Sequence, residues 1–152
     1  MAMSPLDGLC LDGLAADTWS EVLEAMALAA VEHGHARDTF PAALAERERN
    51  YPTGLPTEVP TAIPHSDPEH VLTTGIGIAR LSEPVAFGEM GGSGETVNVQ
   101  VVVMLLVKPD DGHMAALTAV LERVQDNEAM TSLLAAEGDQ DLQRRAALVF
   151  GG

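Results

Sequence analysis

The chain contains few of the residues that stabilise small proteins by covalent or aromatic contacts. Of its 152 residues only Cys10 is a cysteine, which excludes an internal disulfide and a cysteine-only zinc site. Aromatic residues make up 3%, so any core must be aliphatic. A chain of this length buries roughly 68–70% of its unfolded surface on folding. We therefore expect a single domain, residues 1–152, that needs no covalent staple.

Long hydrophobic runs are also missing. The longest, Val101 to Val107, is far too short to cross a bilayer as a helix. The first residues show neither a basic region nor a long apolar stretch, so no signal peptide is expected. A single cysteine agrees with a reducing compartment. These observations lead us to expect a cytoplasmic protein.

Positive charge is the scarcest property of the sequence. Lysine and arginine together number 8 against 23 aspartates and glutamates, giving a formal net charge of −15. Nucleic-acid binding requires cationic surface, so we expect no nucleic-acid partner, and docking on an anionic membrane is disfavoured. The acidic surface would steer a protein partner with a basic face, or it serves only to keep the protein soluble.

Helical and strand-like patterns alternate along the chain, which predicts an α/β (α+β) fold with a central mixed β-sheet flanked by helices. The expected strands are Leu9–Leu11, Thr61–Ile63, Gly75–Leu81 and Val97–Val107. The expected helices run from Trp19 to Gly34 (capped by Asp17 or Thr18), over Ala42–Arg49 (capped by Thr39), from His113 to about Asp126, and over Glu128–Ala136 and Asp141–Leu148. Tyr51–Pro56 is expected to be a loop and Glu89–Glu95 a turn.

His65 is the strongest candidate for chemistry. It follows Pro64 at the end of the expected strand Thr61–Ile63. The proline ring fixes its own φ and biases Ile63 towards extended geometry, so the histidine has a well-defined position. Imidazole is a nucleophile that can carry a covalent intermediate. The interpretation that we favour is that His65 carries a phosphoryl group, although a lone histidine at a strand end is often structural.

Groups that suit an anion lie just upstream of this histidine. Arg47 offers a planar, permanently charged fork that matches phosphate oxygens. Thr53 and Gly54 lie in the expected loop, where the glycine allows close backbone approach. If this loop folds back over His65, these residues would bind the phosphoryl group and stabilise its charge.

His113 is the second candidate. It begins a predicted helix directly after the long buried strand, and free N–H groups at a helix N-terminus favour anions. A neutral ring there could donate a hydrogen bond to a phosphoryl oxygen or fix the tautomer of His65. The alternative is an ordinary first residue of a helix.

Two further patterns favour other functions only weakly. His33 and His35 lie at a predicted helix end, and with the other histidines they would bind metal only if the fold brought them together. We expect no metal site, and we expect His70 to face solvent. The segment Glu89–Thr96 resembles a phosphate-binding loop, but it lacks Gly-Lys-Ser/Thr and a strand follows it, so nucleotide binding is not expected.

The linked motif Arg47-Glu48, Tyr51 to Leu55 and Ala62-Ile63-Pro64-His65 resembles the enzyme IIA component (EIIA type 2) of the fructose/mannitol class of the sugar phosphotransferase system (PTS). The similarity extends from about Trp19 to Leu148. The forms Tyr-Pro-Thr-Gly-Leu-Pro-Thr and Pro-His-Ser-Asp-Pro-Glu-His-Val look most like its galactitol-specific branch.

The resemblance implies a phosphotransferase/anion-transport-protein-like fold and an active enzyme. His65 would accept a phosphoryl group from the phosphocarrier HPr and pass it to a cysteine of a IIB component, while the membrane component IIC is reached only indirectly. Arg47 and His113 match the family's residues that stabilise the transferred phosphoryl group and orient the nucleophile. No cofactor is implied. A regulatory EIIA-like module, which signals its phosphorylation state by protein binding without transport, remains the alternative.

Overall fold

The computed structural model describes residues 2–151, and its centre is a five-stranded mixed sheet with the order β1-β4-β5-β3-β2. Neighbouring strands pair in turn parallel, antiparallel, parallel and antiparallel across the sheet. This confirms the predicted class, a mixed sheet flanked by helices. The strands are β1 Pro5–Leu14, β2 Gly54–Leu55, β3 Thr61–Ala62, β4 Gly75–Gly88 and β5 Thr96–Leu106.

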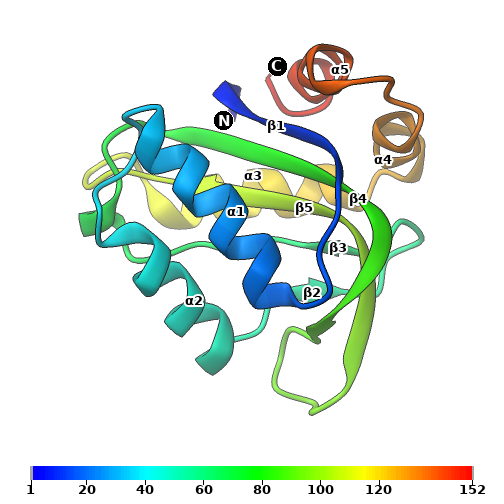
Figure 1. Ribbon diagram of the computed structural model, residues 1–152, viewed down its shortest axis with the longest axis horizontal. Helices are drawn as coiled ribbons and strands as arrows, with labels where there is room; N and C mark the ends of the chain where they lie inside the picture. The colour runs from blue at the N-terminus through cyan, green and yellow to red at the C-terminus, as the bar shows by residue number, and fades with distance from the viewer. Residues whose placement is uncertain (1, 152) are drawn as a thin grey trace.

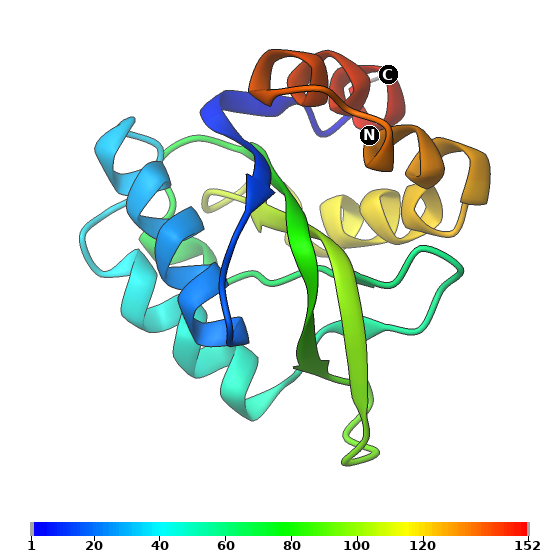
Figure 2. The ribbon, with the colours of Figure 1, turned by 45° about the vertical axis from the view of Figure 1, so that its right-hand side comes forward.

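Helices cover both faces of the sheet (Figures 1 and 2). The helices α1 and α2 lie on one face, whereas α3, α4 and α5 lie on the other, and the two ends of the chain come together beside α5. A short 3₁₀ helix, η1, connects the middle of the chain to β4. The bounds are α1 Trp19–Glu32, α2 Phe40–Asn50, η1 Pro68–His70, α3 His113–Val124, α4 Asn127–Leu134 and α5 Asp139–Phe150.

The long strand β5 contributes to two hydrophobic cores because its residues alternate between the faces of the sheet. Val101, Val103 and Leu105 pack towards the α3–α5 layer. Val102 and Met104 pack towards α1 and α2. Both sides of the strand are therefore buried, as its nearly continuous apolar sequence predicts. The end of this strand is consequently a rigid platform in the middle of the molecule.

The predicted N-terminal capping bond is present in α1 but not in α2. Thr18 caps α1, with its hydroxyl accepting a hydrogen bond from the backbone N–H of Glu21. Thr39 stands at the predicted cap position of α2 but makes no capping bond. Its hydroxyl instead lies 2.8 Å from Nδ1 of His70. That contact leaves the His70 ring half-buried, which corrects the expectation that it faces solvent.

Two strands, β1 and β4, extend beyond their predicted bounds, and a third, β2, was not predicted. β1 begins at Pro5 rather than Leu9, and Gly54–Leu55 pairs with β3 where a loop was expected. β4 continues past Leu81, with a register shift between Arg80 and Val85. Pro84 lies in this irregular stretch, and a residue without an N–H fits there because no ladder bond is required. Pairing with distant strands, which local patterns do not show, sets all three bounds.

Candidate functional site

The backbone around His65 is fixed to the central strand. The carbonyl of Pro64 accepts a hydrogen bond from the N–H of Leu105 at 3.0 Å, and His65 forms an isolated parallel bridge with the same residue. The His65 side chain is only 5% exposed. This histidine is therefore held at the end of the sheet by main-chain contacts.

The His65 ring has a defined tautomer. Its Nδ1 lies 2.9 Å from the carbonyl oxygen of Ile63. A carbonyl oxygen can only accept, so the neutral ring carries its proton on Nδ1 and donates it to Ile63. The lone pair is then on Nε2. A nitrogen with a free lone pair is the atom of an imidazole ring that can act as a nucleophile.

His113 lies next to this ring. The two ring centroids are 5.2 Å apart, with the ring planes inclined by 58°. His113 is the first residue of α3, and Gly112 before it adopts a left-handed conformation with φ of 74°, which glycine adopts without steric cost. Nδ1 of His113 is buried and has no hydrogen-bond partner within residues 2–151. Because an unpaired buried N–H is costly, we place the proton of this ring on Nε2.

Arg47 extends from α2 towards the same region. Its Nη1 lies 3.6 Å from Oδ1 of Asp67, and its guanidinium stacks over the Tyr51 ring at 4.8 Å from the centroid. Its Nε is buried and without a partner in the described part of the chain. The guanidinium therefore retains donor capacity for an incoming anion.

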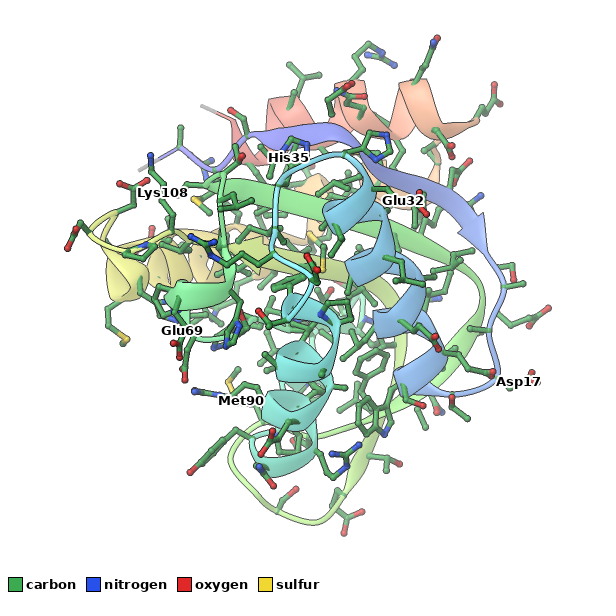
Figure 3. All side chains as sticks on the ribbon, turned by 60° about the vertical axis from the view of Figure 1, so that its left-hand side comes forward. Asp17, Glu32, His35, Glu69, Met90 and Lys108 are labelled. Carbon is green, nitrogen blue, oxygen red and sulfur yellow. The ribbon has the colours of Figure 1, made fainter. Side chains whose placement is uncertain are left out.

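A cavity of about 550 Å³ is lined by both Arg47 and His65. The end of α2 lines one side, with Arg47 and Tyr51, and His65 lies in its wall. The glycine-rich tip of the β4–β5 hairpin supplies Met90 to Gly92. In Figure 3, Met90 lies beside α2. The sequence assigned no role to this tip, and no local signal identifies it, because only the pairing of β4 with β5 brings it to the site.

Thr53 and Gly54 lie close to His65 but are engaged by other protein groups. The Thr53 N–H and O–H both donate to Glu48, each at 2.8 Å. Gly54 packs against the hairpin so closely that a methyl group on its Cα would lie 2.6 Å from the Gly88 carbonyl oxygen. The close backbone approach predicted for this glycine is therefore made to the hairpin. Direct phosphoryl binding by the two residues remains a prediction.

Burial and nearby positive charge favour the neutral form of both rings. Burial lowers the pKa of His65, and the nearby His113 and Arg47 lower it further, whereas the bond to Ile63 opposes the shift. Burial and Arg47 likewise lower the pKa of His113. A neutral His65 ring is the reactive form, because protonation would remove the Nε2 lone pair. Cys10, by contrast, is buried, and burial raises the pKa of its thiol to about 11.

The remaining histidines lie elsewhere. The His33 and His35 rings stack 6.5 Å apart, and each bonds to a backbone carbonyl. In Figure 3, His35 lies at the end of α1 away from Met90. Over residues 2–151 no group of three or more His, Cys, Asp or Glu residues is arranged to hold a metal ion. No helix in that range is long and apolar enough to cross a membrane.

Solved structures with the same architecture are phosphotransfer proteins. Enzyme IIA of the mannitol system of Escherichia coli, determined in complex with phosphorylated enzyme IIB, aligns with a TM-score of 0.74 and 21% identity over 93% of this chain and 96% of that one. The mannitol-specific cryptic enzyme IIA CmtB of Escherichia coli gives 0.74 and 20% over 95% of each chain. The nitrogen regulatory protein IIA-Ntr of Neisseria meningitidis gives 0.68 and 19% over 95% and 96%.

A mixed sheet between two helical layers is the architecture that this chain shares with these enzyme IIA structures. The sequence profile described as "Phosphoenolpyruvate-dependent sugar phosphotransferase system, EIIA 2" matches residues 10–145. The chain belongs to this family and is an EIIA type-2 phosphocarrier domain. No protein of curated function matches it by sequence.

Proposed function

We propose that His65 is the phosphorylated residue of this domain, accepting the group from HPr and passing it to a cysteine of a IIB component in the cytoplasm. The observation that carries this proposal is the Nδ1–H bond to Ile63, which leaves the Nε2 lone pair available within a cavity that also contains Arg47. A IIB partner is also present in the complex of the Escherichia coli enzyme IIA.

The transfer conserves atoms and charge. The Nε2 lone pair of His65 attacks phosphorus, the N–P bond to the HPr histidine breaks, and that histidine regains its lone pair. In the second step a cysteine thiolate of IIB attacks, and the bond to Nε2 breaks. The phosphoryl group adds a charge of about −1.5 to −2 to the site, and Arg47 and His113 stabilise this charge. The buried strand end keeps His65 in place for both steps.

The substrate of the wider system is a sugar or polyol that this domain does not touch. The Tyr51 to Thr57 and Pro64 to Val71 segments support a galactitol-like specificity because of their resemblance to that branch. Measuring transfer from the phosphorylated domain to purified galactitol-type and mannitol-type IIB proteins would test this. Faster transfer to the galactitol-type partner is expected, and preference for the mannitol-type partner would contradict it.

Phosphorylation at His65 is tested by incubating the protein with phosphoenolpyruvate, enzyme I and HPr, followed by mass spectrometry. One acid-labile phosphoryl group per chain is expected. His65→Ala should abolish it, while the control His33→Ala should retain it because His33 lies outside the cavity. Labelling of the His65→Ala variant would contradict the assignment.

Replacement of Arg47 or His113 should slow transfer without removing the acceptor. Loss of one donor to the transition-state charge lowers kcat by about 10²- to 10³-fold. Rapid-quench measurement of the transfer rate from phosphorylated HPr to Arg47→Ala and His113→Ala would check this. A rate equal to that of the wild type in either variant would remove that residue from the mechanism.

A regulatory role is the second candidate, because the similar structures include a nitrogen regulatory IIA protein. In that case the same site would be phosphorylated but would not transfer its group to a IIB cysteine. Chasing the phosphorylated protein with candidate IIB proteins separates the two roles. Transfer to IIB supports transport, whereas a stable phosphorylated form with all of them supports regulation.

A further inference from the structure

A buried carboxylate lies behind the reactive histidine. Glu48 is adjacent to Arg47 in α2, but its side chain turns inward and is only 4% exposed. Both of its oxygens accept hydrogen bonds from Thr53, one from the N–H and one from the O–H. Burying a carboxylate is costly unless it is hydrogen-bonded, and these two bonds offset part of that cost.

Hydrogen bonds connect this carboxylate to the histidine ring. Because Thr53 gives its hydroxyl proton to Glu48, the lone pairs of Oγ1 are free to accept, and they receive the N–H of Ile63 at 3.2 Å. The carbonyl of the same Ile63 accepts the proton of His65 Nδ1 at 2.9 Å. One residue, Ile63, is therefore held by Thr53 on its N–H side and by His65 on its carbonyl side.

We propose that Glu48 is a positioning residue, acting through Thr53 and Ile63 to hold the His65 ring with its Nε2 lone pair directed into the cavity. The kinetic part of this inference rests on the proposed role of His65 as phosphoryl acceptor. Glu48 itself does not line the cavity and touches neither phosphate nor partner. Its effect is to orient the Thr53 hydroxyl, which fixes the Ile63 peptide and thereby the carbonyl that selects the tautomer of His65.

The first test is Glu48→Gln. An amide of the same shape has one accepting atom instead of two, so it can no longer accept from both the N–H and the O–H of Thr53. Thr53→Val removes the hydroxyl while conserving shape, and Thr53→Ser is the matched control that retains it. We expect kcat for phosphorylation to fall by about 10- to 100-fold in Glu48→Gln and Thr53→Val, because small misplacements of a reacting atom have effects of this size.

Two readouts separate positioning from simple stabilisation. KM for phosphorylated HPr should not change in Glu48→Gln or Thr53→Val. Thr53→Ser retains the hydroxyl, so its kcat should be close to the wild-type value. Combining Glu48→Gln with Thr53→Val should slow transfer no more than the slower single variant, because both changes break the same series of bonds. Unfolding in urea shows whether each variant is folded. If Thr53→Val does not fold, Glu48→Gln and Thr53→Ser decide the question.

A third readout needs no phosphoryl donor. Nitrogen chemical shifts of the His65 ring, measured by NMR, report which nitrogen carries the proton. The wild-type neutral ring should be protonated on Nδ1, and this fraction should fall in Glu48→Gln. A folded Glu48→Gln protein with unchanged kcat and unchanged ring shifts would overturn the proposal and leave Glu48 as a structural staple. Unchanged ring shifts would contradict the positioning role of Glu48 whether or not HPr is the phosphoryl donor. Failure of this proposal can therefore be distinguished from failure of the proposed function.

Discussion

In its proposed role as phosphoryl acceptor, the imidazole of His65 needs a free lone pair on Nε2, and its surroundings favour the neutral ring. Burial, His113 and Arg47 all disfavour the added positive charge, and they lower the pKa of His65 below its ordinary value of 6.5. Lower pKa values of this kind are common where a group has to react near neutral pH. We therefore expect the His65 ring to keep its Nε2 lone pair in mildly acidic solution.

This shift predicts a pH dependence of stability as well as of reactivity. A histidine whose pKa is lowered by folding contributes stability above pH 6.5, and the contribution is lost as the pH falls through its folded pKa. The free energy of unfolding should therefore decrease on acidification below pH 6.5, and less steeply in His65→Ala. Urea unfolding across this range, with an NMR titration of the ring, measures both effects. A His65 pKa above 6.5 would contradict the prediction.

Single residues of the site were predictable to different degrees. His65, Arg47 and His113 follow from motif and position. The structure places Arg47 and His65 in the wall of one cavity, with the His113 ring beside that of His65. The engagement of Thr53 by Glu48 was not predictable, because their side chains meet only after the chain turns at the end of α2. Asp67, whose Oδ1 lies 3.6 Å from Nη1 of Arg47, was not among the predicted site residues.

At the scale of elements, the tip of the β4–β5 hairpin lines the cavity and is held by main-chain contacts with β2. The N–H of Met90 donates to the carbonyl of Gly54 at 2.8 Å, and Gly54 also bridges Glu89. The hairpin tip contains Gly91, Gly92 and Gly94, which have no side chains to pack, so main-chain contacts with β2 hold this tip in place. Any side chain at position 54 would separate the two elements.

Gly54→Ala tests this contact. The added methyl group would meet the Gly88 carbonyl at 2.6 Å, so the hairpin must move away. We expect a loss of about 1–3 kcal/mol in the free energy of unfolding, the usual cost of overpacking, together with slower phosphorylation of His65. Urea unfolding and the HPr assay measure the two. Wild-type stability and rate would show that the hairpin does not depend on Gly54.

Element boundaries show where sequence patterns lose information. The amphipathic helices appear close to their predicted positions, because their periodicity and caps are local. The two ends of β1 and the second half of β4 were missed, since their polar and glycine residues become strands only by pairing with distant segments. The two-residue strand β2 is likewise defined by its partner β3 rather than by its own residues.

For the whole molecule, the net charge of −15 is the dominant electrostatic property. Ion pairs such as Arg80 with Asp12 and Arg145 with Asp141 are local attractions that salt weakens. With 23 acidic and 8 basic residues, repulsion among the unpaired carboxylates outweighs them. Self-repulsion of this kind destabilises the compact state.

We therefore expect sodium chloride to stabilise the protein. Raising ionic strength from about 0.01 M to about 0.15 M shortens the screening length from roughly 30 Å to roughly 8 Å and should raise the thermal midpoint. Thermal unfolding followed by circular dichroism over this range is the measurement, with sucrose at matched osmolality as a control for general exclusion effects. A midpoint that falls with salt would mean that the local ion pairs outweigh the repulsion.

The bond from His65 to Ile63 has a consequence for how this protein can change over time. Its acceptor is a main-chain carbonyl, and every amino acid carries the same carbonyl. No single replacement at position 63 can delete that acceptor, and only proline there would also remove the N–H that donates to Thr53. The bond from His65 is therefore retained after most substitutions at position 63, and the surrounding sequence can change without removing it. This tolerance of substitutions agrees with a fold that the chain shares with a protein only 20% identical to it.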